Sequence, residues 1–145
     1  MYRIGFLKGR PRGAAAVEFA LVAPLLTLLL AGVYDAGVAY RIEHVLTKVA
    51  REGARLASIT PALQPDDPLV DQVVRKVMQQ SGVDPTAAEC SVSFESPLAS
   101  GSPIRVNVAL GFRPALGALL PSWREPVRLS ASTVMRYQAP GEVEP

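Results

Sequence analysis

A single carboxylate, Glu18, stands near the start of a long apolar segment. It is the only charged residue between Ala14 and Val33. An ionisable group inside a membrane-length helix is costly, so such a residue indicates a functional site by default. The alternative is a glutamate without a role, because Glu18 lies only about 6 Å beyond Ala14 along a helix and its side chain can bend toward the lipid head groups.

Side chains that catalyse reactions or bind metals are scarce in the rest of the chain. The 145 residues include one histidine, His44, and one cysteine, Cys90. His44 has no partner residue at the spacing of a metal site or a catalytic triad. We expect a buried thiol at Cys90, with an intermolecular disulfide as the alternative. No phosphate-binding glycine loop, zinc-ligand spacing or nucleophile elbow occurs in the sequence, so we expect no enzyme activity, cofactor, metal site or small-molecule substrate.

The apolar segment itself predicts a transmembrane helix. Its roughly 20 residues span about 30 Å as a helix, which is the thickness of the hydrocarbon core of a bilayer. A buried helix of a soluble domain is the alternative, but such helices seldom lack a polar face over this length. Pro24 removes one helical hydrogen bond, and we expect a kink there, which either lets the helix stretch during assembly or is simply tolerated. Small residues that permit close packing of helices in lipid recur along the segment and just beyond it: Ala20, Ala23, Ala31, Gly32, Ala36, Gly37 and Ala39.

The charges predict an orientation for this helix. The first 13 residues carry four basic residues and no acidic one, whereas residues 41–145 carry 11 of each sign. Basic residues next to a transmembrane helix keep that end in the cytoplasm. We therefore expect residues 41–145 on the far side of a membrane that the chain crosses once. Because this part is neutral and its basic residues are not clustered, we do not expect it to bind nucleic acid.

Three fates of the N-terminus are compatible with these residues. Cleavage after Ala39 by a signal peptidase would release a soluble domain, although the apolar core is longer than that of usual signal peptides. Without any cleavage, the protein would stay anchored in the membrane. Cleavage after Gly13, on the cytoplasmic side, would make Ala14 the new N-terminus and Glu18 the fifth residue.

The third fate corresponds to a family resemblance. Residues 13–25, GAAAVEFALVAPL, resemble the prepilin N-terminus of the TadE-like minor pilins (pseudopilins) of tight-adherence, or Flp-type, pili. Two further segments, Asp35-Ala36-Gly37 and the VAREGAR run at residues 49–55, extend the resemblance, which covers residues 10–58. Over the C-terminal domain, only the size and the strand pattern agree with the family.

The resemblance implies a set of processing and assembly residues. A membrane-embedded prepilin peptidase would cut between Gly13 and Ala14 and remove the basic cytoplasmic leader, residues 1–13. Glu18 and Phe19 correspond to the family's glutamate–aromatic pair, and the glutamate would pair with the free N-terminal amine of a neighbouring subunit. An ammonium group favours the charged form of a carboxylate that lacks solvent, and the pair would set the axial register of the helices rather than add stability.

The resemblance also implies partners and a function. The partners are the prepilin peptidase, other minor and major pilins, the inner-membrane platform that assembles the pilus, and the lipid bilayer. The implied function is that of a minor pilin for a pilus used in adhesion and surface attachment. Such a subunit would be held in the inner membrane, with residues 41–145 in the periplasm, or incorporated into the extracellular fibre. The alternative is a secreted or single-pass membrane-anchored binding domain with no role in a pilus.

The residues beyond the membrane predict a small α+β domain. Helical spacing of apolar residues continues to Ser58, so we expect one helix over residues 14–58, of which 14–40 form the transmembrane and assembly part. A second helix is expected after the N-cap Asp67, with Pro68 in its first position. Three runs of alternating apolar and polar residues predict a three-stranded antiparallel sheet packed on the helices: 90–95, 104–112 and 127–136.

Two segments of this domain, residues 41–145, carry their own expectations. The connection Pro114–Pro126 is unusually apolar for a loop, and we expect it to cover the sheet, with contact to a partner as the alternative. The tail at residues 140–145 is rich in proline and glutamate, and we expect it to be frayed.

Overall fold

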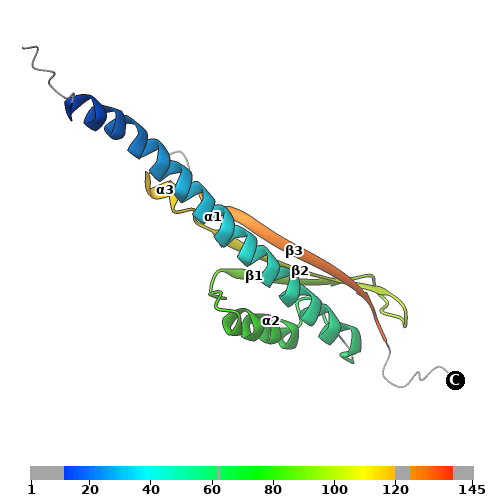
Figure 1. Cartoon of the computed structure of the whole chain (residues 1–145). Coiled ribbons are helices and arrows are strands. Elements are labelled where there is room, and N and C mark those ends of the chain that lie inside the picture. The colour runs from blue at the N-terminus through cyan, green and yellow to red at the C-terminus, as the bar shows by residue number, and fades with distance from the viewer. Residues whose placement is uncertain (1–11, 62, 120–124, 139–145) are drawn as a thin grey trace, which may run out of the picture.

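One long helix organises the molecule. The structure, a computed structural model, describes residues 12–61, 63–119 and 125–138. Helix α1, Arg12–Ile59, contains 48 residues. Its C-terminal half packs against a small domain, and its N-terminal half projects from that domain (Figure 1). The expected long helix over residues 14–58 is confirmed, whereas the leader up to residue 11 and the tail at 140–145 lie outside the described residues.

Helix α2, Pro68–Gln80, begins as its sequence predicts. The carboxylate of Asp67 accepts a hydrogen bond of 2.9 Å from the backbone amide of Leu69, and the proline in the first position has no amide that needs a partner. The helix is followed by Gly82, whose φ of 71° is rarely adopted by residues with a side chain. One face of the helix is buried and carries Val70, Val74 and Met78.

The three predicted strands form one antiparallel sheet in the order β1-β2-β3. The strands are β1, Ala88–Phe94, β2, Pro103–Phe112, and β3, Val127–Arg136. Because β2 lies in the centre, its inward side chains are completely buried against α1: Ile104, Val106 and Val108. The α+β class, with a long apolar N-terminal helix, a second helix and an antiparallel sheet, is therefore confirmed.

The core lies between α1, α2 and the inner face of the sheet. The side of α1 that faces the core is completely buried and carries Leu46, Val49, Ala50, Ala54 and Ala57. At Gly53 the packing is closest, because an added Cβ would lie 3.1 Å from Cγ2 of Val74 and 3.3 Å from Cγ1 of Val106. The glycine thus lets α1 approach α2 and β2 at the same point.

The connection between β2 and β3 differs from the prediction. It contains a short helix, α3, Leu116–Leu119, which contacts α1 and none of the described strands. The expectation that 114–126 covers the sheet is therefore wrong for its described N-terminal part, whereas residues 120–124 lie outside the described residues. The physical reason is that Asp35 of α1 binds the start of α3, as described below.

Candidate membrane and assembly helix

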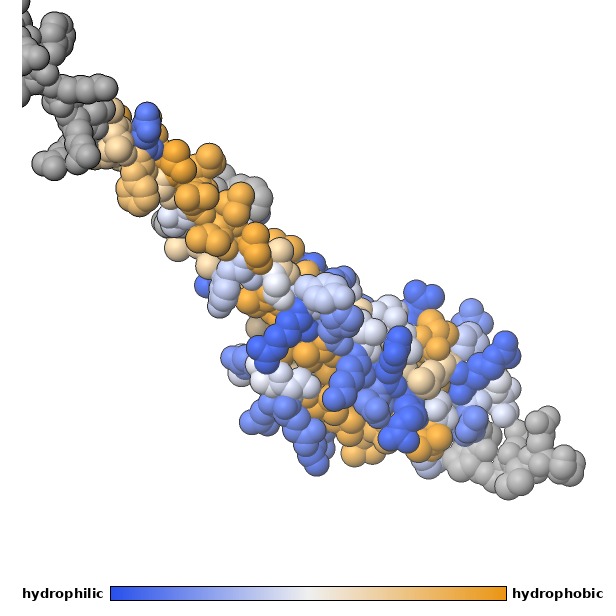
Figure 2. Space-filling view, in the orientation of Figure 1, coloured by the Kyte–Doolittle hydropathy of each residue, from blue (hydrophilic) through white to orange (hydrophobic). Residues whose placement is uncertain are grey.

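The N-terminal half of α1 is apolar and uncovered. Among the described helices, α1 alone is long and apolar enough to cross a membrane, and its most apolar stretch buries none of its residues. Figure 2 shows this half as a nearly continuous hydrophobic surface, in contrast to the mixed surface of the domain. Its large exposed apolar side chains are Val17, Phe19, Leu21, Val22, Leu25, Leu26, Leu28, Leu29, Leu30 and Val33. Soluble surfaces rarely carry an apolar patch of this extent, so α1 fits a single-pass membrane anchor.

The two residues of the predicted processing site lie in the first turn of α1. Gly13 and Ala14 are both exposed. A Cβ added at Gly13 would meet no other atom within 4 Å. The bond between the two residues is thus not covered by the described part of the chain, and its cleavage stays a prediction.

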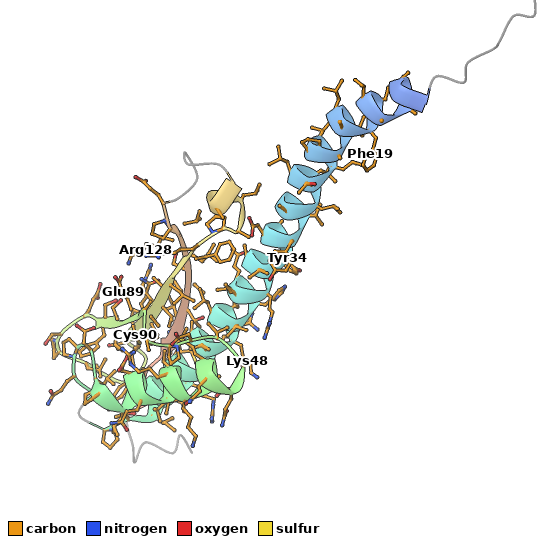
Figure 3. All side chains as sticks on the ribbon, turned by 90° about the vertical axis from the view of Figure 1, so that its left-hand side faces the viewer. Phe19, Tyr34, Lys48, Glu89, Cys90 and Arg128 are labelled. Atoms are coloured by element: carbon orange, nitrogen blue, oxygen red, sulfur yellow. The ribbon has the colours of Figure 1, made fainter. Side chains whose placement is uncertain are left out.

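Glu18 and Phe19 lie one turn further along the projecting half. Both side chains are exposed, and the exposed fraction of Phe19 reaches 70%. Figure 3 shows Phe19 on the projecting part of α1, far from the sheet and α2. Both side chains are therefore accessible to lipid or to a second chain. The pairing of Glu18 with an amine stays a prediction.

Helix α1 continues through Pro24 without interruption. The hydroxyl of Thr27, in the next turn, donates a hydrogen bond of 2.9 Å to the carbonyl oxygen of Ala23. A threonine that binds a carbonyl four residues back often bends a helix slightly, as does a proline in a helix interior. Both features favour a bend in this turn, and the predicted kink at Pro24 stays a prediction.

Asp35 joins the membrane-length part of α1 to the α+β domain. Its Oδ1 and Oδ2 atoms accept hydrogen bonds from the backbone amides of Ala115 and Leu116, both at 2.8 Å. Only 7% of Asp35 is exposed. One turn earlier, a Cβ on Gly32 would lie 3.7 Å from Cδ1 of Leu116, so the glycine allows α3 to lie close to α1. We call this set of contacts the Asp35 link.

The sequence interpretation noted Asp35 as part of the family resemblance and missed this role. The two partners of the carboxylate are 80 and 81 residues further along the chain. The sequence does contain one indication of this role, which is the position of Asp35 at the end of a long apolar run. A carboxylate in apolar surroundings needs hydrogen-bond donors. Nothing in the local pattern identifies backbone amides near residue 115 as those donors.

His44 and Cys90 are the single histidine and the single cysteine of the chain. The His44 ring packs edge-on against Tyr40, with the ring centres 4.3 Å apart. Cys90 lies on the inward face of β1 and is half-buried rather than fully buried. Burial, assisted by the negative charges of Asp71 and Asp66, raises the pKa of the Cys90 thiol to about 11, although Arg75 opposes the shift. A thiol of this kind is a poor nucleophile near neutral pH.

A shallow groove of about 330 Å³ lies where α1 meets the domain. It is lined by Val38, Arg41 and Ile42 of α1, by residues around Gly82, and by the end of β2. Arg41 is partly engaged, because its Nη2 donates a hydrogen bond of 3.2 Å to the carbonyl oxygen of Ser81. Across residues 12–61, 63–119 and 125–138, no group of three or more histidine, cysteine, aspartate or glutamate side chains is placed to hold a metal ion.

Comparison with known protein families gives a match on α1. The family model described as TadE-like protein matches residues 13–55. This range begins at the predicted processing glycine and ends inside the part of α1 that packs on the domain. The chain has no significant match among curated proteins or among solved structures. The resemblance predicted from the sequence is confirmed, and residues 13–55 of this chain are a TadE-like segment.

Proposed function

We propose that the protein is a structural, non-enzymatic minor pilin, or pseudopilin, of a tight-adherence (Flp-type) pilus. In this proposal, a prepilin peptidase removes the leader after Gly13, and α1 holds the chain in the inner membrane with the α+β domain in the periplasm. The assembly platform then recruits the chain, and its helix packs against those of other minor and major pilins.

The observation that carries the proposal is the overlap of the family match with α1. The TadE-like segment, residues 13–55, lies entirely within α1. This helix presents an uncovered apolar rod of membrane length that continues without a break into the core of a small domain. A rod of this kind suits a subunit that is stored in lipid and then packs against helices of other subunits, because both environments require an apolar helix surface.

The geometry of Asp35 favours this proposal over the secreted domain. Cleavage after Ala39 would fall within α1 and would remove Asp35 from the folded unit. The amides of Ala115 and Leu116 would then lose their acceptors, and each unsatisfied amide costs about 1–3 kcal/mol where water does not replace the partner. We therefore expect the domain to be more stable with the whole of α1 than without its first 28 helical residues, Arg12 to Ala39.

The mature N-terminus tests the proposal directly. Protein purified from membranes of cells that contain the prepilin peptidase should begin at Ala14 by N-terminal sequencing and by intact mass. A matched preparation from cells without the peptidase should keep the leader. Mature protein that begins at Tyr40 would establish the secreted domain, and an intact leader in the presence of the peptidase would establish a simple anchor.

A substitution tests the assembly role of Glu18. Glu18→Ala should leave processing and membrane insertion largely intact but should reduce co-purification with other pilins, because it removes the group proposed to pair with a neighbouring amine. Val17→Ala provides the control, since Val17 is also exposed, lies in the same turn and carries no charge. Equal recovery of pilins with both variants would remove the register role from Glu18.

A further inference from the structure

Helix α3 lies beside the last turns of the apolar part of α1. The Asp35 link holds the start of α3, and Leu116 reaches back to Gly32, one turn closer to the N-terminus. Figure 1 shows α3 next to α1 on the side of the domain from which the apolar half projects. Asp35 lies about 31 Å from Ala14 along the helix, which is one hydrocarbon thickness. Helix α3 is therefore level with the outer boundary of a bilayer that α1 crosses.

Helix α3 and the two residues before it have no side chain that needs water. Residues 114–119 read PALGAL and contain no charged or hydrogen-bonding side chain. Ala115 and Ala118 are exposed, and Leu116 is half-buried against α1. Among the described elements, α3 contacts α1 only. One side of α3 thus packs on α1, and the opposite apolar side is not covered by the described part of the domain.

The backbone at the start of α3 is also adapted to a poorly hydrated place. The first amides of a helix have no partner within the helix, and in or near lipid each unpaired amide is costly. Asp35 supplies acceptors for two of them with short, nearly equal distances. A turn on a water-exposed surface would not require a buried carboxylate from a segment 80 residues away.

We propose that α3 is a second membrane contact of this protein, seated in the outer interfacial layer of the bilayer and held there by the Asp35 link. The inference rests on the membrane-spanning role of α1 in the proposed function, but not on processing or on a pilus. Lipid is the occupant because the neighbouring surface of α1 is continuous with the apolar rod: Val33 and Tyr34 are each 64% exposed at this level. Tyrosine is enriched where the hydrocarbon meets the head groups.

The second contact has a physical consequence for the outer domain. A single transmembrane helix is free to tilt and to rotate about its axis, because its tilt is set only by packing and by interfacial anchors. Because α3 is a short apolar helix fixed to one side of α1, any rotation or tilt of α1 changes the depth of α3 in the interface. The bilayer thereby restricts the orientation of the outer domain before any other subunit binds.

A depth measurement in vesicles tests this inference. The full chain, in a Cys90→Ser background, is labelled with an environment-sensitive fluorophore at Ala118→Cys and reconstituted into phosphatidylcholine–phosphatidylglycerol vesicles. Lipids that carry a spin label near the head group should quench the fluorophore at 118 more strongly than lipids labelled deep in the acyl chain. The same label at Ser132→Cys, on the exposed outward face of β3, is the control and should be quenched by neither.

Two further variants connect the depth of α3 to the Asp35 link. Asp35→Ala should reduce quenching at 118 to the level of the label at 132, while circular dichroism verifies that the domain remains folded. Gly32→Leu should act in the same way without touching the carboxylate, because the larger side chain displaces Leu116. Unchanged quenching at 118 in both variants would overturn the role of the link.

A label at Leu30→Cys distinguishes the membrane span of α1 from the interfacial contact of α3. Quenching of the label at 30 by deep spin labels, together with no quenching at 118, would overturn the interfacial contact and leave the membrane span intact. No quenching at either position would overturn both the span and the inference that depends on it.

Discussion

Two carboxylates on the same helix have opposite environments. Asp35 is buried and has both oxygens bound to amides of its own chain. Glu18 is exposed on the projecting half of α1. On the same helix, the hydrogen bonds of one acid are therefore satisfied within the fold, and the other acid is accessible to another molecule. This difference assigns a structural role to Asp35 and supports an intermolecular role for Glu18.

The surroundings of Cys90 lower the reactivity of its thiol. The pKa of its thiol is raised to about 11 from an ordinary value of 9.0, so the thiolate fraction at pH 8 is about 100-fold lower than that of an unperturbed thiol. We expect slow alkylation by iodoacetamide at pH 8 and a rate that keeps rising with pH until about 11. Ser93→Cys in a Cys90→Ser background, exposed on the other face of the same strand, is the control and should react quickly.

The raised pKa of Cys90 also predicts how the stability of the fold changes with pH. The folded state favours the neutral thiol, so its contribution is fully present below pH 9.0 and is lost as the pH rises toward about 11. Alkylation of folded protein as fast as that of the unfolded chain at pH 8 would contradict this account of Cys90.

At the scale of elements, the contact of α1 with α2 and β2 depends on Gly53. We expect Gly53→Val to destabilise the fold by about 2 kcal/mol, because overpacking of a tight core costs about 1–3 kcal/mol. For a domain of this size, the melting temperature should fall by roughly 10 °C. Thermal unfolding of the full chain in detergent, followed by circular dichroism, measures the effect.

Gly37→Val is the matched control for this prediction. Gly37 lies in the same helix, but a Cβ there would meet no atom within 4 Å. Both variants introduce the same side chain and the same change in helix propensity. Equal melting temperatures for the two variants would show that the close approach at Gly53 is not needed for stability.

The elements that could be predicted from the sequence are those defined by local patterns. Alternating residues located all three strands, and the Asp67-Pro68 pair located the start of α2, because both signals act within a few residues. The position of α3 could not be predicted in this way. It depends on a carboxylate from residue 35 and on the space left by Gly32, which are separated from it by about half the chain.

At the scale of the whole molecule, the projecting part of α1 has a fixed rotational position relative to the domain. This position determines whether Asp35 faces the start of α3. One alanine inserted after Tyr40 should turn the preceding part of α1 by about 100° relative to the core around Leu46. The Asp35 carboxylate would then point away from Ala115 and Leu116, and we expect faster hydrogen exchange in a peptide covering residues 113–119. Mass spectrometry of the full chain in detergent measures this exchange.

The same insertion between Leu28 and Leu29 is the control. It precedes both Gly32 and Asp35, the two residues of α1 in the Asp35 link, so the link should form normally. Similar exchange of the 113–119 peptide in both insertion variants would contradict the coupling.

The unbroken course of α1 also determines how the protein responds to force. Because the helix has no loop between its projecting apolar half and the buried face at Leu46, the two parts are rigidly joined. A force that pulls the projecting half along the helix axis would move the domain by the same distance. A torque applied to the projecting half would likewise rotate the polar outer face of the sheet around the helix axis.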